Sequence, residues 1–128
     1  MLELVTGGSG SGKSAYAESR ICEYNRQASK PLFYIATMYP YGEETEKKIE
    51  RHRMLRKGKG FETLEWYTGL KLHLEEGSLQ GSDVLLECMS NLVANEMYME
   101  SGAGCHADQA ILEAVSYTHL TLPTICSV

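Results

Sequence analysis

The sequence predicts an α/β fold in which a mostly parallel sheet is flanked by helices. Short apolar runs alternate with longer runs that lack Gly and Pro, a pattern typical of strands that alternate with helices. The segment 83–88 has an apolar centre without polar alternation and ends near an acidic residue, as in strands covered on both faces. A glycine-rich loop separates the first apolar run from the segment after it. Together these features favour a parallel sheet with crossover helices.

The first half of the chain is expected to contain two strands and two helices. Residues 2–6 are a short apolar run that stops at glycines, which predicts a strand, and residues 14–27 are expected to form a helix. Residues 32–37 are β-branched and aromatic, which predicts a second buried strand. Residues 43–56 open with acids and close with bases, so both ends complement a helix macrodipole.

The second half continues the alternation. We expect a strand over 61–66, a helix over 70–76, a strand over 83–88, a helix over 90–100 capped by Ser90, a loop over 101–104 and a helix that begins at Asp108. No internal repeat is present. The helix from Asp108 is expected to be cut short after Glu113, so the fold is expected to be incomplete at the C-terminus.

Composition restricts the class of protein. The 128 residues suffice for one domain, and 43% apolar with 23% charged residues is typical of a globular chain rather than a disordered one. The net charge of −5 repels a nucleic-acid backbone, so no nucleic-acid partner is expected. No long apolar run or basic leader is present, which predicts no membrane span and a cytoplasmic location. The four cysteines lack C-x-x-C spacing, so reduced thiols are expected.

The last residues differ in composition from the rest. Residues 115–128 contain no Asp, Glu, Lys or Arg, although charge is spread evenly through the preceding 114 positions. Residues 115–124 can be encoded by GTC TCT TAT ACA CAT CTG ACG CTG CCG ACG, which resembles the transposon-end adaptor of sequencing libraries. The adaptor's flanking bases also fit Ala114 and Ile125.

We therefore interpret residues 114–128 as a non-native tail and residues 1–113 as the N-terminal part of a single domain. On this interpretation the native protein is longer and the chain is a fragment. The alternative is a natural polar tail rich in threonine.

The strongest motif is a phosphate-binding loop between the first strand and the first helix. It fits G-x-x-x-x-G-K-[ST] through Gly7, Gly8, Ser9, Gly10, Ser11, Gly12, Lys13 and Ser14. Glycines let backbone N–H groups face a phosphate, Lys13 reaches the β and γ oxygens, and Ser14 can bind Mg²⁺. The alternative, a flexible Gly/Ser linker, does not explain Lys-Ser after the loop or a strand before it. The fold expected is therefore a P-loop nucleotide-binding fold.

Two further positions carry candidate chemistry. Glu87 ends a buried strand, where a carboxylate can coordinate Mg²⁺ beside a phosphate loop; the alternative is a carboxylate that faces water. His52 lies in a basic run of the helix over 43–56, beside Arg51, Arg53 and Arg56. Like charge disfavours protonation of the imidazole there, which would keep a nucleophilic nitrogen available. The alternative is a solvated basic face, and His73 and His106 are assigned no role.

The ordered set of motifs resembles the bifunctional adenosylcobinamide kinase and adenosylcobinamide-phosphate guanylyltransferases of cobalamin biosynthesis. The resemblance covers Leu4 to about Glu100. It rests on the V-T-G-G-x-x-S-G-K-S loop at 5–14, on Y-I-A-T at 34–37, on Glu44 with I-x-R-H-R-x-x-R at 49–56, on T-x-E at 63–65, and on L-L-E-C at 85–88 with Asn95 beyond.

The resemblance implies a role for each matching residue. His52 would be the nucleophile that takes GMP from GTP, while Thr37, Arg53, Arg56, Glu65 and Glu87 would help bind the nucleotide. ATP and GTP would be substrates with Mg²⁺, and the partners would be a corrinoid and a nucleoside triphosphate. A homo-oligomer is compatible with these expectations. The alternatives are a generic P-loop kinase of a small metabolite, or an inactive nucleotide-binding fragment.

Overall fold

The computed structural model describes residues 2–8, 10–28, 30–77, 79–121 and 124–127. The elements follow in the order β1 (Leu2–Val5), α1 (Lys13–Ala28), β2 (Leu32–Ala36), α2 (Glu43–Arg56), β3 (Phe61–Glu65), α3 (Leu70–Glu75), β4 (Asp83–Glu87), α4 (Met89–Tyr98), a 3-10 turn (Gly104–His106), α5 (Ala107–Thr121) and β5 (Thr124–Ser127). The predicted α/β alternation is confirmed through α4.

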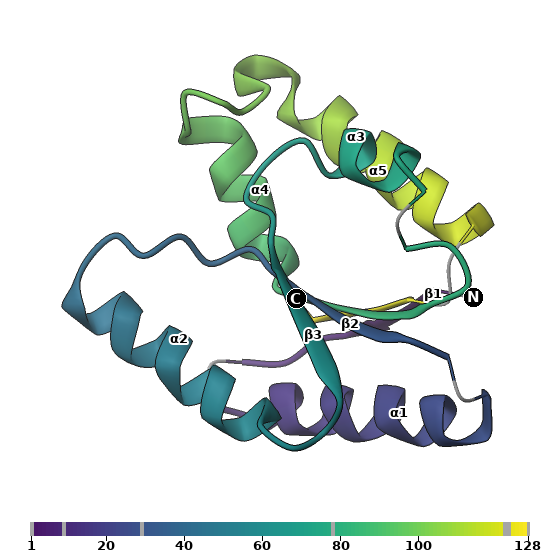
Figure 1. Cartoon of the computed structure of the whole chain (residues 1–128). Coiled ribbons are helices and arrows are strands. Elements are labelled where there is room, and N and C mark those ends of the chain that lie inside the picture. Colours follow the sequence, from purple (N-terminus) through teal and green to yellow (C-terminus); the bar gives the residue numbers. More distant parts are fainter. Residues whose placement is uncertain (1, 9, 29, 78, 122–123, 128) are drawn as a thin grey trace.

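The strands form one parallel sheet in the order β1-β5-β4-β2-β3. Helix α1 covers one face, with α2 beside it, while α3, α4 and α5 cover the other (Figure 1). Since all strands run in one direction, the loops after β1, β2, β3 and β4 meet at one edge of the sheet.

Apolar packing lies on both faces of the sheet. On the α1 side, Ala17 and Ile21 pack against Val5, Leu32 and Leu85. On the other face, a cluster joins α3, α4 and α5 to strands β2 and β4, and it contains Ile35, Leu70, Leu74, Leu79, Val84, Leu86, Leu92 and Ala114. All five residues of β4 are buried, which confirms the strand expected around its apolar centre, Val84 to Leu86.

Two details differ from the sequence-based expectation. Helix α4 begins at Met89, so Ser90 lies inside the helix instead of capping it, and its hydroxyl lies 3.0 Å from Cys88 Sγ. Helix α5 does not stop at Glu113 but runs to Thr121, and β5 follows it between β1 and β4. Part of the segment interpreted as a non-native tail is therefore helical and part pairs within the sheet.

Candidate functional site

The glycine-rich loop connects β1 to α1. Gly10 and Gly12 have φ angles of +73° and +86°, a left-handed conformation that glycine adopts without strain. A Cβ at Gly7 would lie 2.6 Å from Ser11 Oγ, so only glycine fits there without a shift. Because α1 begins at Lys13, its unpaired N–H groups and positive dipole end adjoin the loop. Ser9 lies outside the described residues.

The Lys13 ammonium lies over this loop. Its Nζ donates to the Gly7 carbonyl at 3.2 Å and to the Gly8 carbonyl at 3.5 Å. The ammonium and the helix start therefore place positive charge on one small concave stretch of backbone. Such a site suits an anion with several oxygens, such as a phosphate.

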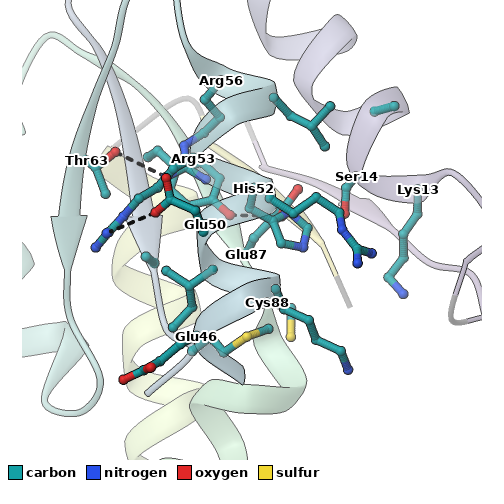
Figure 2. A pocket seen from close by; sticks show the side chains of 18 of the residues that line it. Lys13, Ser14, Glu46, Glu50, His52, Arg53, Arg56, Thr63, Glu87 and Cys88 are labelled. Atoms are coloured by element: carbon teal, nitrogen blue, oxygen red, sulfur yellow. Dashed lines mark hydrogen bonds and ion pairs between the residues drawn. The ribbon is translucent and has the colours of Figure 1, made fainter. Parts of the chain in front are cut away.

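A pocket of about 790 Å³ opens beside the loop, at the carboxyl edge of the sheet. Ten of the residues expected to be functional line it: Gly10, Ser11, Gly12, Lys13, Ser14, His52, Arg53, Arg56, Glu65 and Glu87. Figure 2 shows Ser14 from α1, His52 from α2 and Glu87 from β4 gathered around this pocket. The tertiary structure thus brings together segments separated by more than seventy positions in the sequence.

His52 lies next to a buried carboxylate. Its Nδ1 is 3.5 Å from Glu87 Oε2, and the two side chains are 27% and 5% exposed. At this length the contact is an electrostatic one, and the buried Nδ1 has no hydrogen-bond partner among the described residues. Arg51 and Arg53 are exposed on α2. The charged group that faces the imidazole is therefore a carboxylate, whereas the sequence suggested the neighbouring arginines.

Tyr34 holds the same Glu87 oxygen that faces His52. The Tyr34 hydroxyl donates to Glu87 Oε2 at 2.9 Å, while Glu87 Oε1 is buried with no hydrogen-bond partner in the described part of the chain. Burial raises the pKa of Glu87; the Tyr34 hydrogen bond and the nearby His52 and Arg56 oppose this rise. Burial also raises the pKa of Tyr34, and the Glu87 charge adds to that increase. The Tyr34 hydroxyl therefore remains a donor at neutral pH.

The oxygens of Ser14 and Glu87 fit a hard cation. A hydroxyl and a carboxylate are ligand types that Mg²⁺ accepts, and the unpaired Glu87 Oε1 is available for one. Among the described residues no group of three or more His, Cys, Asp or Glu could hold a metal ion. Mg²⁺ at this place would therefore need oxygens from water or from a bound phosphate, as is common for this ion.

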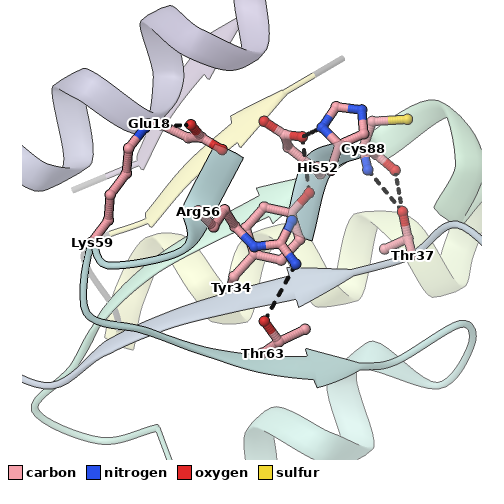
Figure 3. Close-up of polar contacts among 9 residues, drawn as sticks. Glu18, Tyr34, Thr37, His52, Arg56, Lys59, Thr63 and Cys88 are labelled. Atoms are coloured by element: carbon pink, nitrogen blue, oxygen red, sulfur yellow. Dashed lines mark hydrogen bonds and ion pairs between the residues drawn. The ribbon is translucent and has the colours of Figure 1, made fainter. Parts of the chain in front are cut away.

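Arg56 is the one buried residue of α2, at 6% exposure. Its guanidinium lies 3.5 Å from the centroid of the Tyr34 ring, and its Nη2 donates to Thr63 Oγ1 at 3.3 Å. The first contact is a cation–π interaction, and both fix the C-terminal end of α2 against the sheet. Figure 3 shows these contacts around Tyr34.

Arg53 and Glu65 form an exposed pair at the rim of the pocket. Arg53 Nη2 donates to Glu65 Oε1 at 2.7 Å, and the Tyr67 hydroxyl donates to Glu65 Oε2 at 3.3 Å. Both side chains of the ion pair are 49% exposed. A ligand in the pocket can therefore reach either of them.

Thr37 does not line the pocket. The residue is fully buried, and its Oγ1 donates to the Cys88 carbonyl and accepts from the Cys88 N–H, each at 2.8 Å. Asn95 Nδ2 donates to the Thr37 carbonyl at 2.7 Å. The expected direct contact with a nucleotide does not fit this burial. Thr37 instead connects β2 to the chain just after Glu87.

Tyr34, Glu18 and Lys59 belong to the same polar cluster, and none of their contacts was expected from the sequence. Lys59 Nζ lies 3.1 Å from Glu18 Oε2, and Glu18 is 1% exposed (Figure 3). One signal was available for Glu18, because it follows Ser14 by four residues and so shares its helix face. Tyr34 was quoted only as part of the Y-I-A-T motif, and its hydrogen bond to Glu87 was not expected, since an aromatic residue in a strand is most simply a core residue.

Two other histidines, His73 and His106, lie away from this cluster. His73 stacks on Trp66 with ring centroids 4.4 Å apart and an interplanar angle of 9°. His106 ends the 3-10 turn that precedes α5. Neither residue lines the pocket beside the phosphate loop.

A parallel sheet flanked by helices, with a G-x-x-x-x-G-K-S loop between its first strand and first helix, defines an α/β fold that is compatible with the P-loop class. The family model described as "Cobinamide kinase / cobinamide phosphate guanyltransferase" matches residues 3–126. The chain belongs to this family.

Two relatives are each described as "Bifunctional adenosylcobalamin biosynthesis protein CobU". The protein of Escherichia coli (strain K12) is 34% identical over 102 residues, which is 80% of this chain and 53% of the relative. The protein of Salmonella typhimurium (strain LT2) is 30% identical over the same shares. The chain therefore spans about half the length of the curated relatives it matches. In the described part of the chain, no helix is both long and apolar enough to cross a membrane.

Proposed function

We propose that the protein phosphorylates adenosylcobinamide and then transfers GMP to the resulting phosphate, giving adenosylcobinamide-GDP. Family membership supports both activities, because the family description names a cobinamide kinase and a cobinamide phosphate guanyltransferase. The observation that carries the proposal is the shared pocket, which is lined by Lys13 and Ser14 of the phosphate loop and by His52. One pocket thus offers a site for a triphosphate and a nucleophile beside it.

In the kinase step, a substrate hydroxyl attacks the γ-phosphorus of ATP or GTP. The new P–O bond forms as the bond to the β-phosphate bridging oxygen breaks, and the nucleoside diphosphate leaves. Lys13 and the start of α1 hold the phosphates, and the ammonium would exchange its loop carbonyls for phosphate oxygens. Mg²⁺, held by Ser14 and Glu87, would supply charge neutralisation on the phosphates.

In the transferase step, an imidazole nitrogen of His52 attacks the α-phosphorus of GTP. An N–P bond forms, the bond to the bridging oxygen breaks, and pyrophosphate leaves. A phosphate oxygen of adenosylcobinamide phosphate then attacks the same phosphorus, so the N–P bond breaks and the imidazole is restored. Glu87 lies at Nδ1, which leaves Nε2 as the attacking nitrogen.

Arg53, Arg56 and Glu65 line the same pocket and are proposed nucleotide-binding residues. The two guanidinium groups bring positive charge to the His52 side of the pocket, where a phosphate must lie for attack. Glu65 holds Arg53 at 2.7 Å and so orients one of these cations. Thr37 would contribute indirectly, through the backbone that follows Glu87.

We also propose that residues 114–128 are non-native and that the native protein is longer, so activity is to be tested on the full-length protein encoded at the source locus. Incubation with GTP labelled at the α-phosphate should leave label on that protein, whereas GTP labelled at the γ-phosphate should leave none. A generic P-loop kinase of a small metabolite would retain neither label. That second result would reject the transferase half.

A further inference from the structure

Helix α2 carries His52, yet little apolar packing holds it. Arg56 is its one buried residue, while Met54 and Leu55 are 59% and 47% exposed. The N-cap residue before it, Gly42, has no side chain that could cap the helix. The position of His52 over the pocket therefore depends on polar contacts at the C-terminal end of α2.

One of these contacts reaches α1. Lys59, three residues beyond α2, places its Nζ 3.1 Å from Oε2 of Glu18. Glu18 belongs to α1, and its residue exposure is 1%, whereas the Lys59 side chain is 43% exposed. Glu18 Oε1 has no hydrogen-bond partner among the described residues. The Lys59 ammonium, at Oε2, is therefore the contact that compensates the charge of this buried carboxylate. Figure 3 shows the pair beside the Arg56–Tyr34 contact.

We propose that Glu18 and Lys59 are positioning residues, whose ion pair ties the end of α2 to the phosphate-loop helix and thereby sets the position of His52 relative to a phosphate in the loop. The inference rests on the proposed function. Glu18 lies four residues after Ser14, one turn along the same helix face. Neither Glu18 nor Lys59 lines the pocket, so the pair acts through α2 and not on the substrate.

The difference in burial predicts unequal effects of the two single substitutions. Lys59→Met leaves a buried carboxylate without its cation, which a folded protein tolerates poorly. Glu18→Gln leaves Lys59, which is near enough to the surface to turn toward water. The double variant removes both charges, so it should recover part of the loss seen in Lys59→Met.

The test measures two quantities on the full-length protein well below its unfolding temperature. One is the initial rate at which label from α-labelled GTP appears on His52, and the other is the affinity for a non-hydrolysable ATP analogue. Lys59→Met should slow labelling by about tenfold or more, since a displaced nucleophile is costly, and should change analogue affinity by less than about twofold. Glu18→Gln should slow labelling less, and Lys59→Arg should keep a near-parental rate because it restores the charge.

Lys57→Met is the matched control, because Lys57 is an exposed lysine of the same turn with no side-chain contact recorded among the described residues. It should label at the parental rate. The proposal would be overturned if Lys59→Met and the double variant both took up label at the parental rate. It would also be overturned if Lys59→Met lost labelling rate and analogue affinity to the same extent. Failure of the parent protein to take label would overturn the proposed function and this inference with it. If Lys59→Met does not fold, Glu18→Gln and the double variant decide the outcome.

Discussion

Nδ1 of His52 lies 3.5 Å from the Glu87 oxygen that also accepts the Tyr34 hydroxyl hydrogen bond. These three groups come from α2, β4 and β2, so the arrangement exists only in the folded chain. A carboxylate at one ring nitrogen orients an imidazole and leaves the opposite nitrogen free to react. In the proposed transferase step, this geometry predicts which ring nitrogen of His52 would bond to GMP.

We expect the GMP–protein bond to be formed at Nε2 of His52. Protein carrying ¹⁵N-labelled histidine would be guanylylated, and nitrogen–phosphorus coupling would identify the bonded nitrogen by NMR. The two phosphoramidate isomers of a histidine model compound supply reference spectra. A bond to Nδ1 would contradict the orientation set by Glu87.

His52→Asn should abolish retention of label from α-labelled GTP. The amide can form hydrogen bonds but has no nucleophilic lone pair of comparable strength. Phosphoryl transfer should survive, because phosphate positioning and charge stabilisation belong to the loop and Mg²⁺. His73→Asn serves as the control, since His73 stacks on Trp66 away from the pocket. Persistent labelling of His52→Asn, or label mapped to His73 or His106, would remove His52 from this role.

Lys13→Ala should reduce kinase turnover by about 10²-fold or more, because the ammonium stabilises charge on the transferred phosphate. The measurement is transfer of γ-label to the corrinoid by the full-length protein. Lys30→Ala is the comparison, since Lys30 is exposed and lies outside the pocket. Turnover of Lys13→Ala within about threefold of the parent would be incompatible with the expected loss of a transition-state contact.

Glu3→Gln should remove a pH-dependent part of stability far from the pocket. Arg20 donates two hydrogen bonds to Glu3, both at 3.1 Å, and these bonds hold the pKa of Glu3 below its usual value near 4.5. A lowered pKa in the folded state means stabilisation that is present above pH 4.5 and is lost as the pH falls through the folded-state pKa. The urea midpoint of the parent should exceed that of Glu3→Gln at neutral pH, and the difference should shrink in acid.

Glu23→Gln is the control for this measurement, because Glu23 is exposed on the same helix with no recorded partner among the described residues. The difference in urea midpoint between Glu23→Gln and the parent should not shrink in acid as it does for Glu3→Gln. If the urea midpoint of Glu3→Gln lies below that of the parent by the same amount at neutral and acid pH, the Arg20 pair does not stabilise the fold through ionised Glu3.

The source locus is expected to continue in frame beyond Glu113 and to encode a further strand. In the structure β1 pairs with β5, and β5 in turn pairs with β4, so the place between β1 and β4 requires a strand. Amplification and sequencing across the junction supplies the native residues. Genomic codons for Thr118 to Thr124 would end the adaptor interpretation.

Several features were predictable because neighbouring residues specify them. The phosphate loop is a continuous stretch of glycines and serines followed by Lys-Ser, and α2 has the bounds expected from its acidic start and basic end. The strand at 83–87 was predictable from its short apolar centre, Val84 to Leu86, which suits a strand covered on both faces. The capping role predicted for Ser90 was wrong, because α4 begins at Met89 and its N-cap position is Cys88, two residues before Ser90.

The sequence by itself therefore determined the alternation of strands and helices, the phosphate loop and the helix that carries His52, since each depends on spacing within one segment. Only the tertiary structure decided that His52 faces Glu87, that Tyr34 holds Glu87, and that Glu18 pairs with Lys59. It also decided that Thr37 is buried and that β5 lies between β1 and β4. These outcomes depend on which strands become neighbours and on which side chains lose water, and local patterns of residues do not encode either.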